Sequence, residues 1–317
     1  MPSRRLSRED AAVLQYRIRP YLRGANRGQL RERLEDVLRN LYTITPVGKV
    51  GLTQLKGVPW TWPEKLGDLR HEYGLRGIRF EDDVSFKDLP FHREALDAVK
   101  KNPTLGDYHA VSRVFCKFGK REHMEGMLRE GIVRVAPAST FYATQHNAAR
   151  RDNEMMLTTH ITPYDYDLGL LDPYFKRIMP TRRFAMVEHR KPSDHYLYCV
   201  SVAFDCRLFF DFDADSCVVV RNQDEFVRRL KGYLSWRLPG WTIYFDMVKY
   251  FDPYFICQRL PAPRDDIFFF KHFRYMYQHE HRLVAIPPED WREPLRPMFL
   301  KLGSLEEIAK IVLLRSD

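Results

Sequence analysis

Residues 277–284 read YQHEHRLV, and residues 284–286 continue them as an apolar run. Three phenylalanines at 268–270 lie a short way upstream. A segment flanked by aromatic and branched residues is typical of a buried strand. Polar residues nevertheless occupy 278–282, so this strand is expected to bring ionisable side chains into the protein interior.

The side chains of a strand alternate between its two faces. One face then carries Gln278, Glu280 and Arg282, and the other carries His279 and His281. A buried carboxylate is costly unless it is paired or hydrogen-bonded. Glu280 is therefore expected either to pair with Arg282 or a nearby arginine, or to reach a ligand in a cleft that the strand lines. We favour the cleft, where a carboxylate can stabilise an oxocarbenium-like transition state.

The residues around this strand indicate an α+β domain over 108–317. Strands cluster instead of alternating strictly with helices, which favours a mixed or mostly antiparallel sheet. Strands are predicted over 111–118, 132–137, 195–204, 207–212, 217–222 and 241–251, and helices over 120–131 and 223–236.

Residues 1–107 are interpreted as an accessory region, helical at first and irregular later. Residues 1–42 hold ten arginines against five acids, a surplus of +5 within a chain of net charge +9. Such a surplus is typical either of a solvated basic helix pair or of a surface that docks nucleic acid, an acidic partner or an antitoxin. Composition does not choose between them.

The totals predict a cytoplasmic protein without a membrane segment. The chain has 317 residues, of which 44% are hydrophobic, and no run of 18 or more apolar residues. The basic N-terminus lacks the apolar stretch of a signal peptide. The five cysteines show no CxxC spacing, which suits buried free thiols in a reducing compartment.

Several enzyme classes lose support because their motifs are missing. The sequence contains no GxGxxG, GxxxxGK[ST], HExxH or GxSxG motif and no cysteine–histidine zinc spacing. The acids of DFDAD (211–215) alternate and could face one way to bind magnesium. Together with Glu280 and one of the two histidines, they define an alternative hypothesis, a metal-dependent nuclease.

A second polar stretch, residues 143–154, is dense in hydrogen-bonding side chains. It contains Gln145, His146, Asn147, Arg150, Arg151, Asp152 and Glu154. Such loops often form a binding face on a rigid scaffold. Arg150 and Arg151 could grip a pyrophosphate, because the guanidinium fork matches phosphate oxygens. Internal ion pairs in a solvated loop are the other interpretation.

The order of VFCKFG (114–119), EHMEGMLREG (122–131), IVRVAP (132–137) and the late YQHEHRLV resembles the core of the ADP-ribosyltransferase superfamily. The resemblance implies a split sheet that holds NAD as co-substrate and needs no metal. Glu280 stands in the place of the late glutamate, which contacts the nicotinamide ribose and is commonly catalytic.

The resemblance also assigns roles to other residues. It implies Tyr142 as a second catalytic residue, and Lys117, Phe118, Ser139, Asn147, Arg150 and Arg151 as NAD-binding residues, with Thr140 a further candidate in the second motif. Lys117 departs from the His or Arg of the family's first motif. A lysine does not replace a histidine that bonds a ribose hydroxyl, so Arg113 and Arg151 are also candidates for that role.

Residues 111–315 also resemble a poorly characterised bacterial family found near phage-defence and toxin genes. The shared features are a loop like NAARRDNE, a strand like YCVSVAF and a late YxxExR strand. The expected function is an NAD-dependent ADP-ribosyltransferase that modifies a protein or nucleic-acid acceptor as a toxin or antiviral defence effector. A non-catalytic module is the remaining alternative, in which residues 1–107 dock a partner and Glu280 is a structural ion-pair residue.

Overall fold

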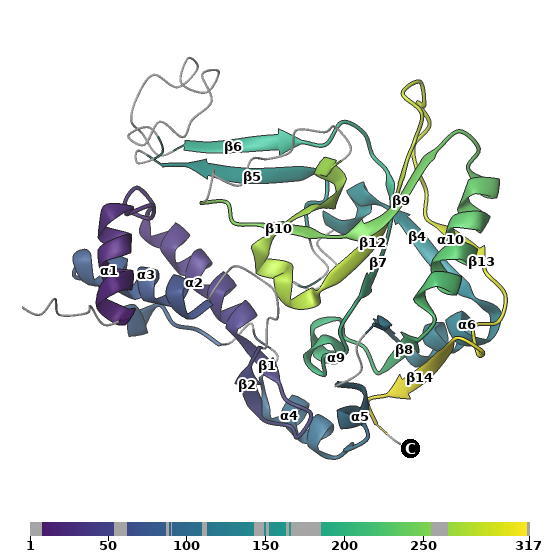
Figure 1. The fold of residues 1–317 in the computed structure, drawn as a ribbon, viewed down its shortest axis with the longest axis horizontal. Coiled ribbons are helices and arrows are strands. Elements are labelled where there is room, and N and C mark those ends of the chain that lie inside the picture. The colour runs from purple at the N-terminus through teal and green to yellow at the C-terminus, as the bar shows by residue number, and fades with distance from the viewer. Residues whose placement is uncertain are drawn as a thin grey trace, which may run out of the picture.

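The computed structural model describes residues 8–53, 62–86, 89, 91–109, 113–142, 149, 152–162, 165, 185–254 and 266–315. Helices and antiparallel sheets share these residues, which confirms the predicted α+β class (Figure 1). Within this part of the chain, no helix has the length and hydrophobicity needed to cross a bilayer. Four cysteines in it are free thiols: Cys116, Cys199, Cys206 and Cys217.

An eight-stranded antiparallel sheet forms the centre of the described structure. Strand β12 pairs along its length with β7 on one side and with β9 on the other. The strands are β3 (Phe115–Gly119), β4 (Ile132–Pro137), β7 (Tyr196–Ser201), β8 (Ser216–Val220), β9 (Thr242–Met247), β12 (Glu280–Ile286), β13 (Met298–Lys301) and β14 (Ala309–Leu313).

The sheet divides at β7. Its start pairs with the end of β4, where Leu197 lies opposite Ala136. Its end pairs with β3, where Ser201 lies opposite Cys116. Strand β12 occupies the whole of one edge of β7. Strands β4 and β3 therefore share the opposite edge, β4 at its start and β3 at its end. One branch continues from β4 to β13, and the other from β3 to β8 and β14.

Two helices, α6 (Arg121–Glu130) and α10 (Gln223–Arg237), cover one face of the sheet. Phe226, Leu230 and Leu234 of α10 are fully buried there, as their spacing along the helix predicts. Helix α6 ends at Gly131, which has φ 67°. A side chain at this glycine would collide with the backbone of Gly303, so this helix end requires glycine.

The opposite face of the sheet carries two hydrophobic clusters. The first contains Phe118, Phe209 and Tyr277, and the second contains Phe268 and Val284. Smaller elements lie on this side: the antiparallel pair β5 (Met156–Ile161) and β6 (Ala185–Arg190), the parallel pair β10 (Lys249–Phe251) and β11 (Phe270–His272), helix α9 (Arg207–Asp211), and the 3-10 helices η2 (Ala138–Tyr142), η3 (Asp266–Phe269) and η4 (Phe273–Gln278).

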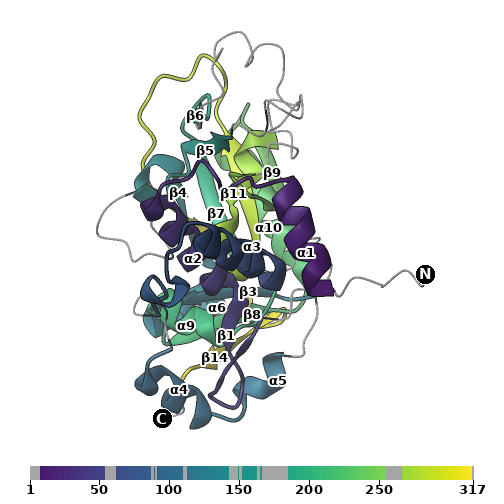
Figure 2. The ribbon, with the colours of Figure 1, turned by 90° about the vertical axis from the view of Figure 1, so that its left-hand side faces the viewer.

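The first three helices of the N-terminal region form a layer that packs on η4 and on the end of β10, and this layer lies in front in Figure 2. Its core includes Tyr254, Phe273 and Met276 of the C-terminal region, and Trp62 stacks on Phe273 at 5.5 Å. The elements of the N-terminal region are α1 (Arg8–Ile18), α2 (Arg27–Leu41), β1 (Tyr42–Ile44), β2 (Val50–Leu52), α3 (Trp62–Leu75), η1 (Phe80–Asp82), α4 (Arg93–Lys100) and α5 (Leu105–His109).

Some local predictions were wrong. Residues 207–212 form helix α9 and not a strand, because Arg207 binds Asp211 one turn later and also the backbone carbonyls of Arg39 and Tyr42. The stretch at 277–284 is strand only from Glu280 onward. Its first residues complete η4, and His279 turns the chain with φ 45°.

Candidate functional site

Glu280, the first residue of β12, is held inside the protein by two cations. The guanidinium of Arg282 donates to Oε1 from Nε at 2.9 Å, and its Nη2 lies 2.7 Å from the same oxygen. The ammonium of Lys271, on β11, donates to Oε2 at 2.8 Å. The carboxylate side chain is 5% exposed. The pairing with Arg282, one of two alternatives left open by the sequence, is therefore present.

Arg282 also binds Glu154, in the turn before β5. Its Nη1 lies 2.8 Å from Oε2 and its Nη2 lies 3.0 Å from Oε1, a bidentate contact. The ammonium groups of Lys191 and Lys271 lie 3.5 Å and 3.6 Å from the same carboxylate. Glu154 therefore lies where three cationic side chains converge.

We call this group the buried charge cluster. It consists of Asp152, Glu154, Lys191, Lys271, Glu280 and Arg282. Three carboxylates face three cations, so the cluster is neutral when all six groups are ionised. Buried charges are tolerated in proteins when they are compensated in this way.

Attraction by the cations keeps the carboxylates of Glu280 and Glu154 ionised. Burial alone would raise the pKa of Glu280, but the charges of Arg282 and Lys271 outweigh it and lower the pKa to about 2. The pKa of Glu154 is lowered well below its usual range, because Arg282, Lys271 and Lys191 outweigh its burial. Both groups are anions at neutral pH.

Two other members of the cluster titrate closer to neutrality. Burial and the neighbouring Glu154 raise the pKa of Asp152 to about 6. Burial lowers the pKa of Lys191 to about 8, against the opposing attraction of Glu154. Perturbed groups of this kind gather at functional sites more often than elsewhere, although structural ion-pair networks also produce them.

The structure joins the two polar stretches that the sequence showed separately. Gln278 accepts a hydrogen bond from Lys271 at 3.2 Å and donates one to the carbonyl of Ala149 at 2.9 Å. Ala149 and Glu154 belong to the stretch 143–154, so this stretch and the start of β12 meet at the cluster. Sequence reasoning missed Lys191 and Lys271, although a lone lysine directly after three phenylalanines is itself a buried charge that needs a partner.

Lys117 lies on the other face of the sheet from Glu280. Ser201 is opposite both Cys116 and Glu280 in the register, so alternation places Lys117 on the far face. Its ammonium donates to the carbonyl of Cys199 at 2.7 Å and lies 4.5 Å from the centre of the Tyr198 ring. The structure therefore does not bring Lys117 and Glu280 together.

Phe118 lies on the same face as Glu280, but inside a hydrophobic cluster. Its ring meets Phe209 edge-on at a centroid distance of 5.0 Å, and Phe204 is 6.0 Å away. Arg113, the other described candidate for the first motif, is exposed and has φ 61°.

The second predicted motif forms η2. The backbone N–H and the hydroxyl of Ser139 both donate to the Asp194 carboxylate, at 3.1 and 2.7 Å. The Thr140 hydroxyl donates to the backbone carbonyl of Pro137. Tyr142 is 63% exposed at the end of η2. Asp194 follows Lys191 by three residues, so the short segment between β6 and β7 connects Ser139 to the cluster.

Asn147, Arg150 and Arg151 lie outside the described residues. Their predicted contacts with NAD stay predictions.

The acids of DFDAD do not share a face, which corrects the expectation behind the nuclease hypothesis. Asp211 is buried against Arg207 at 2.6 Å, whereas Asp213 is 81% exposed and reaches Lys120 at 3.0 Å. Among the described residues, no three His, Cys, Asp or Glu side chains are grouped as a metal site requires. His281 lies on the far face, beside Phe115 and Phe245.

Comparisons with protein-family models, with curated proteins and with solved structures each found no match. The function has to be argued from the residues themselves.

Part of the basic charge of the N-terminal region is used in ion pairs. Arg33 is buried against Asp252 at 2.7 Å. Arg27 pairs with Asp83 and Arg31 pairs with Glu35 at the surface. These contacts reduce the charge available to a nucleic acid, while the exposed arginines that remain keep the region basic.

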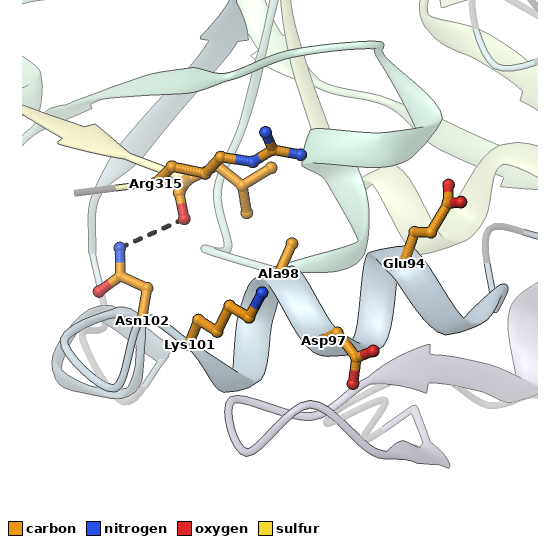
Figure 3. Close-up of a pocket in the computed structure, with 7 residues that line it drawn as sticks. Glu94, Asp97, Ala98, Lys101, Asn102 and Arg315 are labelled. Atoms are coloured by element: carbon orange, nitrogen blue, oxygen red, sulfur yellow. Dashed lines mark hydrogen bonds between the residues drawn. The ribbon is translucent and has the colours of Figure 1, made fainter. Parts of the chain in front are cut away.

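A separate cavity of about 420 Å³ lies between α4 and the end of β14 (Figure 3). Figure 3 shows the charged side chains at its rim coming from both elements. The lining residues are Glu94, Asp97, Ala98, Lys101, Asn102, Leu314 and Arg315. Opposite charges are mixed there, and Asn102 already donates to the carbonyl of Leu314. The cavity therefore has no single charge preference for a ligand, and the buried charge cluster is the stronger candidate site.

Proposed function

We propose that the chain is an ADP-ribosyltransferase-like enzyme that uses NAD to modify a protein or nucleic-acid acceptor, as a toxin or phage-defence effector. The division of the antiparallel sheet at β7 supports this proposal most. Glu280 begins β12, the strand paired to β7 along its whole length. A split sheet with a late glutamate on an inner strand is the arrangement that the sequence resemblance implies.

The electrostatics of Glu280 suit the proposed reaction. Breaking the bond between nicotinamide and ribose develops positive charge on the sugar, which an ionised carboxylate stabilises. The low pKa of Glu280 supplies that carboxylate at any physiological pH. Both of its oxygens have partners in the ligand-free chain. A ribose hydroxyl therefore has to replace one of these hydrogen bonds or share the oxygen.

The other roles follow from exposure and residue type. Tyr142 presents an exposed ring on which nicotinamide can stack. Arg150 and Arg151 belong to the stretch that joins the cluster at Ala149 and would hold the diphosphate. Ser139, linked to Asp194, would orient the nicotinamide ribose or the amide.

The proposal is tested by NAD consumption. The substitution Glu280→Gln keeps the shape and removes the charge, so the rate should fall on the order of 100-fold. Asp213→Asn makes the same change in charge at an exposed position and should leave the rate unchanged. An unchanged rate for Glu280→Gln, or the absence of NAD binding in calorimetry of the wild-type protein, would rule the proposal out.

A non-catalytic ligand-sensing or partner-binding module is the second candidate. The burial of Glu280 with both oxygens paired favours it, because a structural ion pair requires no more than this. In that case Glu280→Gln lowers the melting temperature, and the wild-type protein neither binds nor consumes NAD. Measured together, stability and turnover separate the two candidates.

A further inference from the structure

The three cations around Glu154 form an arrangement suited to a larger anion. A planar guanidinium holds two oxygens, and two ammonium groups approach from other sides. Arginine forks and lysine point charges are the groups with which proteins hold phosphate. All three cationic side chains are almost completely buried, which makes their attraction for an anion stronger than at the surface.

Glu154 makes close contacts with Arg282 but only long contacts with the two lysines. Its contacts with Lys191 and Lys271, at 3.5 and 3.6 Å, are longer than the usual charge-assisted hydrogen bond of about 2.8 Å. Within the described residues, the Lys191 ammonium has this single polar contact for its three N–H donors. A tetrahedral oxyanion, with more oxygens and charge than a carboxylate, would engage these groups more fully.

Two of the three acids of the cluster come from a different part of the chain than its cations. Asp152 and Glu154 belong to one short segment before β5. Lys271 is on β11, Arg282 is on β12, and Lys191 follows β6. One segment therefore supplies two of the three acids, including the carboxylate that contacts Lys191. Its displacement would uncover Lys191 and leave Glu280 as the acid paired with Lys271 and Arg282.

We propose that Arg282, Lys271 and Lys191 form a binding site for a phosphate-class oxyanion, and that Glu154 occupies this site in the ligand-free chain as an internal competitor. Binding then requires the exchange of one anion for another. The inference depends on the proposed function only for the natural ligand, which would be one phosphate of NAD. The site itself can be tested without any turnover.

Calorimetric titration with inorganic pyrophosphate tests the site. Glu154→Gln removes the competing charge and leaves the three cations, so pyrophosphate should bind about tenfold or more tightly than to the wild-type protein. Adding Lys191→Met to this variant should abolish the gain. Glu125→Gln makes the same change in net charge on the outer face of α6 and should bind pyrophosphate as the wild-type protein does.

Asp152→Asn provides a second variant should Glu154→Gln fail to fold. Asp152 contacts the cations through Lys271 at 3.6 Å, so its loss should disturb the structure less and tighten pyrophosphate binding about threefold. If neither variant binds pyrophosphate more tightly than Glu125→Gln, Glu154 is a structural ion-pair residue and the inference is overturned.

Titration with ADP-ribose, side by side with pyrophosphate, shows whether a nucleotide is preferred over the free anion. Tight pyrophosphate binding by Glu154→Gln without NAD consumption by the wild-type protein would refute the proposed enzyme and keep the oxyanion site. NAD consumption by the wild-type protein, without tighter pyrophosphate binding by Glu154→Gln, would support the proposed enzyme and refute the oxyanion site.

Discussion

At the scale of single residues, charge compensation explains the polar side chains of the strand that begins at Glu280. Each of its two ionic residues meets opposite charge from a distant segment: Lys271 for Glu280, and Glu154 for Arg282. Asp152 is different, because its pKa is raised and not lowered. Burial and the nearby Glu154 outweigh the attraction of Lys271. Asp152 is therefore the one carboxylate of the cluster whose ionisation opposes folding.

This imbalance predicts a pH-dependent effect of Asp152→Asn. The folded pKa of about 6 lies above the model-peptide value of 3.8, so stability from this group is present below pH 4 and is lost as the pH rises through 6. In the wild-type protein this loss lowers the free energy of unfolding by up to about 1.4 kcal/mol per pH unit. The asparagine variant has no carboxyl at this position and does not show the loss. Its free energy of unfolding relative to wild type should therefore increase between pH 4 and pH 7.

Urea denaturation of both proteins across this range measures the difference. Asp213→Asn, an exposed substitution, serves as the control and should show the same pH dependence as the wild-type protein. A constant difference between Asp152→Asn and wild type from pH 4 to pH 7 would show that Asp152 titrates normally.

At the scale of elements, helix α2 positions the segment that leads into Glu280. The buried side chain of Asn40 donates to the carbonyls of Phe273 and Arg274, at 3.0 and 3.3 Å, and accepts from the backbone N–H of Tyr277 at 2.9 Å. These groups belong to η4, a 3-10 helix that leaves backbone groups without partners of its own. One side chain of the N-terminal region therefore satisfies three backbone groups of the C-terminal region.

Asn40→Ala should destabilise the protein by about 2–3 kcal/mol, because it leaves buried backbone donors and acceptors unsatisfied. Gln15→Ala, at an exposed position of α1, should change stability by less than about 0.5 kcal/mol. Hydrogen exchange should also accelerate at residues 273–280 in Asn40→Ala more than in the main sheet. Equal stability of the two variants would mean that η4 does not depend on α2.

The sequence predicted the elements whose signals are local. Helices α6 and α10 lie where helices were predicted over 120–131 and 223–236, and residues 132–137 form β4 as predicted. Helix α9 was predicted as a strand, because the contacts that favour the helix involve Arg39 and Tyr42, more than 160 residues away. Helix α3 was missed, because the later part of residues 1–107 was interpreted as irregular; its buried side chains pack on the other N-terminal helices and on Phe273.

The candidate site was also predictable only where its signals are local. Glu280, Arg282 and Glu154 were singled out because each is an ionisable residue in a suggestive pattern. Their mutual contact, and the participation of Lys191, depends on how β6, β11 and β12 pack together. A single sequence contains no signal for that packing. The face occupied by Lys117 likewise depended on the register between β3 and β7.

At the scale of the whole molecule, the N-terminal region and the sheet domain share a core. Arg33 of α2 is fully buried and binds both oxygens of Asp252 at 2.7 Å, while Lys65 of α3 binds the same carboxylate at 2.7 Å. The Arg33 guanidinium also lies 4.7 Å from the centre of the Tyr254 ring and 5.3 Å from that of Phe273. Contacts of this kind connect residues more than 180 positions apart.

Because of this shared core, we expect residues 1–107 to unfold together with the sheet domain. Arg33→Met breaks the buried pair and leaves Asp252 with Lys65 as its remaining cation, which should cost about 3–5 kcal/mol. Arg31→Met, which removes a surface pair from the same helix, should cost less than about 1 kcal/mol. Circular dichroism and tryptophan fluorescence should report one coincident unfolding transition for the wild-type protein and for both variants. Two separated transitions, with only the first moved by Arg33→Met, would show instead that residues 1–107 form an independent domain and that Arg33 and Asp252 stabilise only their contact surface.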